Sequence, residues 1–179
     1  MQIVTLPRLN RALSSVQDEL IFWNFWTPKV SNIEVYLTTI GAAYGWQHYG
    51  GDGSIDIPAI SLCKLTELFR GEYSSLRQII FHEYGHALAH RHPKFFQSKV
   101  FSKAFGSSFS SDQSFYFDPD IFVTEYAEKN ASEDFCETFM LFLKHKGKLP
   151  TRLSSPAIKM KWQFIKKLSA AMKQGKSRW

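Results

Sequence analysis

Two histidines and a glutamate in one short segment could together bind a metal ion and activate a water molecule. In the segment IIFHEYGHALAHRH, residues 79–92, His82 and His86 bracket Glu83 in the pattern His-Glu-x-x-His. Residues four apart lie on one face of a helix, so both imidazoles can reach one ion. Glu83 projects beside them, where it can accept a proton from water. The spacing therefore predicts a hydrolytic zinc site.

A catalytic zinc usually has three protein ligands, so this segment leaves one ligand to be found. His92 lies ten residues after His82, as in the longer motif His-Glu-x-x-His-x-x-Gly-x-x-His. Ala89 stands where that motif has the glycine that lets the chain leave the helix, so we expect His92 to point elsewhere. His90 lies one turn beyond His86, about 6 Å along the helix, and we expect it to pack behind the site.

A carboxylate from a later segment is the third candidate. In TEYAEKNASEDFCETF, residues 124–139, Glu133 and Glu137 are four residues apart. On a helix the first carboxylate could bind zinc while the second accepts the N–H of a ligand histidine. The same residues also suit a structural arrangement, in which Asn130 and Glu133 form a helix cap and Glu137 faces solvent. The spacing alone does not choose between the two.

Two motifs taken together resemble the catalytic domain of anthrax lethal factor and its relatives. The first is FHEYGHA, residues 81–87, and the second is YAEKNASEDFCETF, residues 126–139. The family has a His-Glu-Phe-Gly-His-Ala helix and, downstream, a Tyr-Gly/Ala-x-x-Asn-x-x-Glu-x-Phe-Ala-Glu-x-Phe segment. The resemblance extends over about residues 55–170 and is concentrated in these two motifs.

The resemblance implies a zinc metallopeptidase of the zincin group that acts on a protein or peptide substrate. It implies one zinc ion per chain, and the zinc ligands would be His82, His86 and Glu133. Glu83 would be the general base. Tyr126 would stabilise the oxyanion or protonate the leaving amine, and Glu137 would orient a ligand histidine. A toxin or effector-like protease is the biological role that this resemblance suggests.

The chain departs from the family pattern at two positions. Cys136 stands where alanine is usual, and Asp134 stands where an apolar residue can occur. We expect Cys136 to be a small buried residue on a different helix face from Glu133, with contact to the metal as the alternative because it lies so near the site. A second comparison is with the regulatory peptidases of mobile elements that cleave repressors, which His-Glu-x-Gly-His-x-x-x-His resembles if His90 is its last residue. A zincin-like module that binds a partner without hydrolysis is a further alternative, and the presence of Glu83 argues against it.

The elements that must position these residues follow from the hydrophobic periodicity. Helices are predicted over residues 8–27, 75–91, 131–146 and 156–173. Strands are predicted over 33–40 and 54–62, and Pro58 makes the second an edge strand because it cannot donate to a ladder. We expect this strand to pair with the substrate. The long loop 106–120 is expected to shape specificity pockets through Phe115, Tyr116 and Phe117, or to fill the core with them.

This order of elements predicts an α+β fold, a zincin-like metalloprotease domain with a small mixed sheet, an active-site helix and a C-terminal helical subdomain. The chain has 179 residues, of which 44% are hydrophobic, and this suits a single domain over 1–179. We divide it into an N-terminal helix at 1–27, the sheet and active-site helix at 28–93, and a loop with the helical part and the glutamate ligand at 94–179.

Charge and cysteine content bear on partners and location. The net charge is +6, with much of the excess near the C-terminus, which favours a solvated basic helix face over a nucleic-acid site. Cys63 and Cys136 are expected to be buried free thiols. The N-terminus lacks an ordinary secretory signal, and no stretch is long and apolar enough for a bilayer. We therefore expect a soluble, cytoplasmic protein, with secretion as an effector by a signal-independent route as the alternative.

Overall fold

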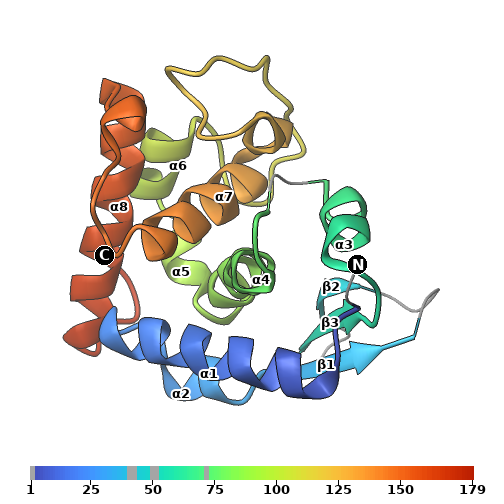
Figure 1. Cartoon of the computed structure of the whole chain (residues 1–179). Helices are drawn as coiled ribbons and strands as arrows, with labels where there is room; N and C mark the ends of the chain where they lie inside the picture. The colour runs from blue at the N-terminus through green and yellow to red at the C-terminus, as the bar shows by residue number, and fades with distance from the viewer. Residues whose placement is uncertain (1–2, 40–43, 49–52, 71–72) are drawn as a thin grey trace.

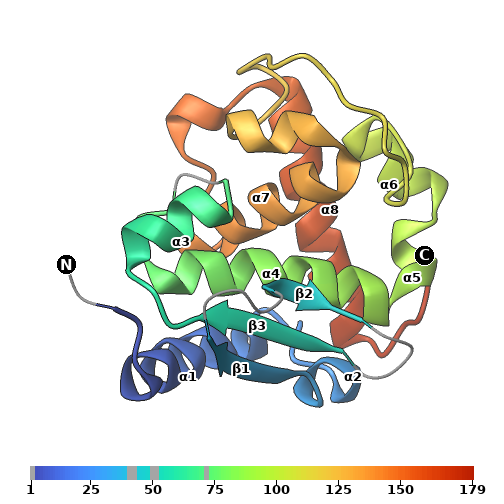
Figure 2. The same ribbon diagram turned by 90° about the vertical axis from the view of Figure 1, so that its right-hand side faces the viewer.

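Helix α4 (Leu76–Arg91) runs through the middle of the molecule and carries the His-Glu-x-x-His motif. The computed structural model describes residues 3–39, 44–48, 53–70 and 73–179. Helix α4 is seen nearly end-on at the centre of Figure 1, with α1 (Leu6–Phe22) below it and α7 (Ala131–Lys144) above it. Figure 2 shows the length of α4 behind the small sheet. The architecture is α+β, as the order of elements predicted.

The remaining elements are short apart from α8 (Pro156–Lys173), which packs against α6 and α7. The short helices are α2 (Pro28–Ser31), α3 (Leu62–Leu68), α5 (Pro93–Phe96) and α6 (Lys99–Phe105), with 3-10 helices η1 (Glu125–Lys129) and η2 (Thr151–Leu153). The strands are β1 (Glu34–Thr38), β2 (Gly45–Gln47) and β3 (Ser54–Pro58).

The sheet is mixed, and its order corrects one prediction. The strands lie in the order β1-β3-β2, with β1 parallel and β2 antiparallel to β3. The segment predicted as an edge strand over 54–62 therefore forms the centre of the sheet. Pro58 is tolerated there because it is the last residue of β3, opposite Thr38. The edge strand beside α4 is β2, which composition did not reveal because it has only three residues.

The four long helices were predicted with small errors at their ends. Helix α8 has the predicted bounds, and Ser155 caps it by accepting a hydrogen bond from the N–H of Ile158 at 3.2 Å. Asn130 caps α7 in the same way, accepting from the N–H of Glu133 at 2.9 Å. The first helix, predicted over 8–27, ends five residues early at Phe22, and the short helix α2 begins just beyond its predicted end at Pro28.

Aromatic side chains fill the space between α5, α6, α7 and α8. Phe135 of α7 lies fully buried against Phe96 at a ring-centroid distance of 4.8 Å and against Phe105 at 5.7 Å. Phe164 of α8 packs on Phe105 at 5.5 Å. Buried aromatic rings contribute a large apolar area to a core, so this cluster fixes α7, and with it the segment that faces α4.

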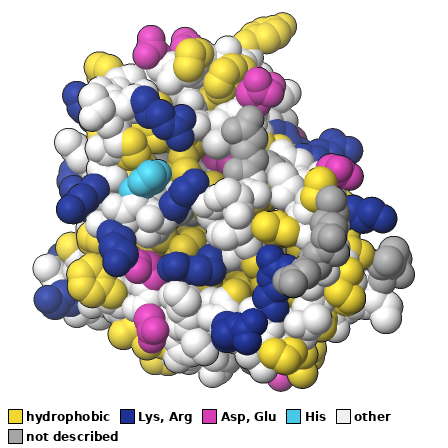
Figure 3. Space-filling view, viewed as in Figure 1, with side chains coloured by type: hydrophobic (Ala, Val, Ile, Leu, Met, Phe, Trp, Pro, Cys, Tyr) yellow, Lys and Arg dark blue, Asp and Glu magenta, His cyan; other side chains and the backbone are white. Residues whose placement is uncertain are grey.

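The surface agrees with a solvated basic helix face. On α8, Lys159, Lys166 and Lys167 are exposed while Trp162 and Ile165 are buried. Lys and Arg side chains are spread across the face in Figure 3, with acidic and apolar side chains between them. None of the helices in the described part of the chain has the length and apolar character needed to cross a bilayer.

Candidate metal centre

Three side-chain atoms from α4 and α7 converge on one point. His82 Nε2 and His86 Nε2 lie 3.2 Å apart. Glu133 Oε2 lies 3.1 Å from the first and 3.3 Å from the second. The helical spacing brings the histidines together, and the packing of α7 on α4 brings the glutamate to them. The structure thus unites all three residues that the resemblance implied as ligands.

The hydrogen-bond partners of the imidazoles indicate which ring nitrogen is protonated and which can offer a lone pair to this point. His82 Nδ1 lies 2.7 Å from Glu137 Oε1, and a carboxylate can only accept, so Nδ1 carries the proton. His86 Nδ1 lies 3.2 Å from the Ser132 hydroxyl, which can accept its proton. In the neutral tautomers with both protons on Nδ1, the two Nε2 atoms and Glu133 Oε2 would present three lone pairs to one another, and without a metal an added proton on His82 relieves their repulsion. A cation between them would turn this repulsion into attraction.

The charge around His82 favours a cation at the same point. Burial alone would lower the pKa of His82, but the carboxylates of Glu133 and Glu137 raise it to about 10. Burial would likewise raise the pKa of Glu133, yet His86 and His82 hold it well below its usual range. A site that stabilises a buried positive charge on imidazole can stabilise a bound metal ion in its place.

The geometry fits zinc. Nitrogen and oxygen ligands about 2.0–2.1 Å from a tetrahedral zinc ion stand about 3.3 Å from one another. The three observed separations, 3.1, 3.2 and 3.3 Å, match one face of such a tetrahedron. Glu133 Oε2 is also buried without a conventional hydrogen-bond donor. The three residues could therefore hold a zinc ion and leave its fourth position free.

Glu137 is fully buried behind His82, not exposed to solvent as the capping alternative required. Besides His82, it accepts hydrogen bonds from Tyr73 Oη at 2.9 Å and from Thr124 Oγ1 at 2.8 Å. These three contacts fix the carboxylate, and through it the ring of His82. Orientation of a ligand histidine by a carboxylate is a common feature of zinc sites.

Glu83 lies in the same cleft, held by the edge strand. Its Oε2 accepts the backbone N–H of Trp46 at 2.6 Å. Gly45, the residue before Trp46, has a φ of +77°. A Cβ on Gly45 would lie only 3.0 Å from Glu83 Oε2. Glycine is thus required both by the backbone conformation and by the approach of the carboxylate. Strand β2 positions the side chain that the motif marked as the general base.

Tyr126 stands on η1 across the cleft from α4. Its ring centroid lies 6.0 Å from that of His82. Burial, followed by Glu133 and Glu83, raises the pKa of its hydroxyl above the ordinary value, so the hydroxyl keeps its proton at neutral pH. Lys129, three residues on, lies on the same side of the 3-10 helix with Nζ 3.4 Å from the hydroxyl. Tyr126 can therefore act as a hydrogen-bond donor beside the centre.

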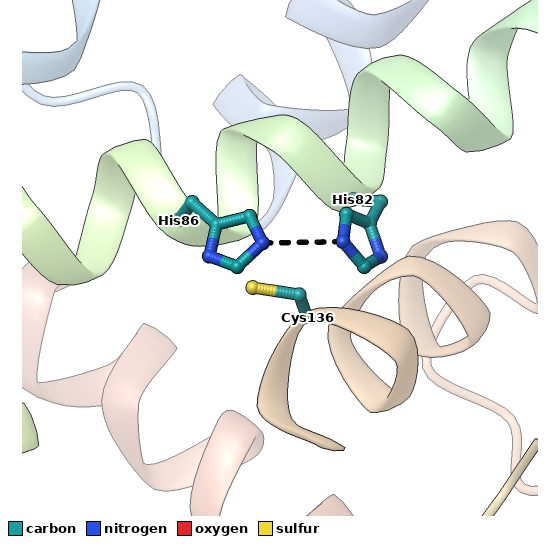
Figure 4. A group of neighbouring side chains, drawn as sticks. All are labelled: His82, His86 and Cys136. Atoms are coloured by element: carbon teal, nitrogen blue, oxygen red, sulfur yellow. Dashed lines mark hydrogen bonds between the residues drawn. The ribbon is translucent and has the colours of Figure 1, made fainter. Parts of the chain in front are cut away.

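Cys136 also reaches the centre, which corrects its predicted position. Its thiol belongs to a group with His82 and His86 in which the ligand atoms all lie within 4.8 Å of one another. Figure 4 shows the sulfur beneath the ring of His86, on the side of the site that faces α7. Residues three apart on a helix share a face, so Cys136 lies on the same side of α7 as Glu133. Burial raises the pKa of the thiol, and nearby carboxylates raise it further.

The other two histidines of the motif segment lie outside the centre. His92 ends α4 and contacts Thr27 Oγ1 through Nε2 at 2.9 Å, so it points away as predicted. His90 is exposed and stacks on His48 with ring centroids 4.3 Å apart, so it packs on another histidine and not behind His82 and His86. Cys63 is also exposed, contrary to expectation, because it faces outward on α3.

The centre opens into a cleft of about 330 Å³. Its walls include Glu83, Tyr126, Trp46, Arg70 and Phe69. A second, more apolar hollow of about 460 Å³ shares His86 and Trp46 with it.

The long loop contributes to that second hollow through Phe109 and Ser110. Phe115 and Tyr116 instead line a separate hollow beside α6 and α8. Tyr116 is 96% exposed and Phe117 42%, so neither fills the core.

Sequence reasoning missed several residues that support the site. Tyr73 and Thr124 hold Glu137, Ser132 contacts His86, and Trp46 holds Glu83. Tyr73, Thr124 and Trp46 reach the site from loops or from a short strand, where periodicity carries no signal. Ser132 lies one residue before Glu133 at the start of α7, so its neighbourhood, though not its contact, could have been predicted.

Comparisons with protein-family models, curated proteins and solved structures find no match to this chain. Function is therefore inferred from the residues of the site and their geometry.

Proposed function

We propose that the chain is a zinc-dependent endopeptidase with a zincin-like fold, similar to lethal factor-like peptidases. The observation that carries this proposal is the convergence of three lone-pair donors, from His82, His86 and Glu133, in an open cleft that also contains Glu83. A structural zinc site would usually have four protein ligands and no use for a free carboxylate beside it. One zinc ion per chain would complete the site.

Glu83 is the proposed general base. A zinc ion held by the three ligands lowers the pKa of water toward ~7 and polarises the carbonyl that the water attacks. Glu83 accepts the proton that the attacking water loses and then delivers it to the leaving nitrogen as the C–N bond breaks. The 2.6 Å hydrogen bond from the N–H of Trp46 keeps the carboxylate aimed into the cleft during both transfers.

Tyr126 is the proposed donor to the developing oxyanion. Its hydroxyl keeps its proton because burial and neighbouring carboxylates raise its pKa. A single donor of this kind typically contributes ~3 kcal/mol to transition-state stabilisation. Lys129, with Nζ 3.4 Å from the hydroxyl, would strengthen the donor by adding positive charge next to it.

An extended peptide would bind along β2. This strand forms the edge of the sheet next to α4, and the side of β2 away from β3 faces Glu83. Edge strands offer backbone groups that a substrate can pair with, and here the carbonyl of Trp46 would take that role because its N–H donates to Glu83. The substrate strand is therefore β2 and not β3, whose two edges are both already paired.

A non-catalytic metal-binding module is the competing function, and Cys136 is the observation that favours it. If Cys136 joined His82, His86 and Glu133 on one ion, the four protein ligands would leave no position for water. Regulatory cleavage of repressors would use the same chemistry as the proposed endopeptidase and differs only in substrate. Activity measurements separate the hydrolytic functions from the non-catalytic one.

The test is cleavage of a diverse peptide library by the zinc-loaded protein. We expect the wild type to cleave, and Glu83→Gln to lose about 10²–10⁴-fold in rate while keeping its zinc. Glu125→Gln, which alters an exposed carboxylate one residue before Tyr126, is the matched control and should cleave like the wild type. Equal cleavage by the wild type and Glu83→Gln would refute the role of Glu83. Full zinc occupancy with no cleavage of any peptide would favour the non-catalytic module.

A further inference from the structure

Cys136 is a buried, potentially metal-binding side chain that the proposed peptidase mechanism does not use. Its sulfur and a ring nitrogen from each of His82 and His86 lie within 4.8 Å of one another. The sulfur comes from the opposing helix and lies beneath the ring of His86 (Figure 4). Two imidazoles and a thiol form a recognised type of donor set for transition metals.

A glycine on α4 makes room for this thiol. Gly85 lies between the two ligand histidines, and a Cβ placed on it would stand 3.0 Å from the sulfur of Cys136 and 3.2 Å from its Cα. Any larger residue at position 85 would push α7 away from α4. The close contact of the two helices therefore brings the sulfur to the level of the imidazoles.

Two different third donors thus face the same pair of histidines. Glu133 offers a hard carboxylate oxygen, and Cys136, one turn further along α7, offers a soft sulfur. Hard and borderline ions accept oxygen readily, whereas thiophilic ions prefer sulfur. The softness of the ion should then decide which residue of α7 completes the site.

We propose that this centre binds thiophilic ions such as Cd²⁺ through His82, His86 and Cys136, while zinc uses Glu133. The thiol releases its proton to solvent as the sulfur–metal bond forms, and no oxidation or reduction takes place. The proposal relies on the metal site of the proposed function but not on peptide hydrolysis. Its consequence is a site whose ligand set, and therefore whose open coordination position, depends on the ion.

The experiment compares Cd²⁺ and Zn²⁺ binding in chains that carry Cys63→Ser, which removes the exposed thiol. With one equivalent of Cd²⁺, we expect a thiolate-to-metal charge-transfer band in the near ultraviolet, and Cys136→Ser should abolish it. Cys136→Ser should also weaken Cd²⁺ affinity by at least roughly tenfold, because loss of a residue that only supports a metal ligand already costs about that much. Its effect on Zn²⁺ affinity should be smaller. Glu133→Ala should do the opposite, weakening Zn²⁺ more than Cd²⁺.

Circular dichroism of each metal-free variant establishes that the fold is retained, and Cys136→Ala provides a second substitution if serine disturbs packing. A Cys63→Ser chain with Cys136 intact that binds one Cd²⁺ without a charge-transfer band would overturn the proposal. The proposal would also be overturned if Cys136→Ser and Glu133→Ala each weakened Cd²⁺ binding and Zn²⁺ binding by equal factors. Zinc binding and peptide cleavage would survive either result, whereas failure of the proposed function would appear as absence of zinc-dependent cleavage with the cadmium band intact.

Discussion

Helix α7 buries a carboxylate on each of two sides, and the two sides solve the problem of buried charge differently. Toward α8, Asp134 is fully buried and lies 2.6 Å from the ammonium of Lys161. Toward α4, Glu137 and most of Glu133 are buried against His82, and these two carboxylates raise the pKa of His82 to about 10, so its ring takes up a second proton. The first side has a permanently charged ammonium, whereas the second depends on a ring whose added proton a metal ion can replace.

This difference separates a structural ion pair from a candidate binding site. Burying an ionised group costs several kcal/mol unless a partner compensates for the loss of water. Lys161 provides part of that compensation for Asp134, although burial still raises the pKa of this carboxyl to about 7, and Lys161 also donates to the carbonyl of Ile121 at 2.5 Å. Around Glu133 and His82 the compensation comes mainly from a proton on His82 or from a metal ion, with the half-exposed Lys129 Nζ 3.7 Å from Glu133 Oε1. Four substitutions or treatments test this contrast.

The largest effect should come from Lys161→Met. This change leaves Asp134 buried without its cation, and loss of one partner of a buried pair costs about 3–5 kcal/mol. Urea-induced unfolding measures the loss of stability. Lys159→Met, on the exposed face of the same helix, is the control and should change stability by less than about 0.5 kcal/mol.

The double variant Asp134→Leu with Lys161→Met tests whether the loss comes from the unpaired charge of Asp134 or from lost packing of the Lys161 side chain. We expect it to recover most of the stability lost in Lys161→Met, since no buried charge remains. A loss in the single variant no larger than in Lys159→Met would show that Asp134 is not charged in the folded protein, and would remove the contrast between the two sides of α7.

Metal removal should have the next largest effect. An ion that binds only the folded chain stabilises it by about 2.7 kcal/mol when its free concentration is 100 times Kd. Thermal unfolding with zinc and with a chelator measures this difference. Lys161→Met should show the same zinc-dependent gain as the wild type, because its substitution lies on the other side of α7. A chelator that leaves unfolding unchanged would contradict the metal-site account.

Glu137→Gln should weaken zinc binding without abolishing it. The amide can still accept the proton of His82 Nδ1 but no longer carries the charge that makes the ring a strong ligand. Loss of such a partner typically costs 10–100-fold in metal affinity, which is about 1.4–2.7 kcal/mol. Competition with a chromophoric chelator gives the affinity, with Glu125→Gln as the exposed control. Unchanged affinity would mean that Glu137 contributes to packing alone.

The smallest effect concerns His92, which lies beyond the site. Burial, followed by Lys29 and Arg91, lowers the pKa of His92 from 6.5 to about 4 in the folded chain. The unfolded chain therefore takes up a proton first as the pH falls, so the stability present above pH 6.5 is lost toward pH 4.

His92→Asn should reduce that loss by about 1 kcal/mol, a modest value because the side chain is partly exposed to screening solvent. Unfolding experiments across this pH range, in the presence of chelator, measure it. A pH profile that matches that of the wild type would contradict the depressed pKa of His92.

The sequence predicted the parts of the site that lie at fixed spacing on helices. Spacing of four residues places His82 with His86, and the Asn130 cap sets the start of α7. The pairing of Glu133 with the histidines required the resemblance, because no local rule specifies which face of α7 meets α4. Cys136 was assigned to the wrong face, although its three-residue separation from Glu133 already indicated a shared one.

The sheet was harder to predict than the helices. Pro58 suggested an edge strand by a sound rule, but a proline at the last position of a strand breaks no interior hydrogen bond, so β3 occupies the centre. Strand β2 is three residues long, too short for an alternating pattern to be recognised. Its contact with Glu83 depends on Gly45 and on the backbone of Trp46, which side-chain patterns do not reveal.

The most direct test of the central claim is zinc content per chain. It is best measured in the Cys136→Ser background, so that the thiol cannot substitute for a lost ligand. After dialysis, elemental analysis should give close to one zinc in the parent chain and in its His92→Ala and Glu83→Gln variants. Glu133→Ala should have lost its zinc. Loss of zinc in His92→Ala together with retention in Glu133→Ala would contradict a centre built from His82, His86 and Glu133.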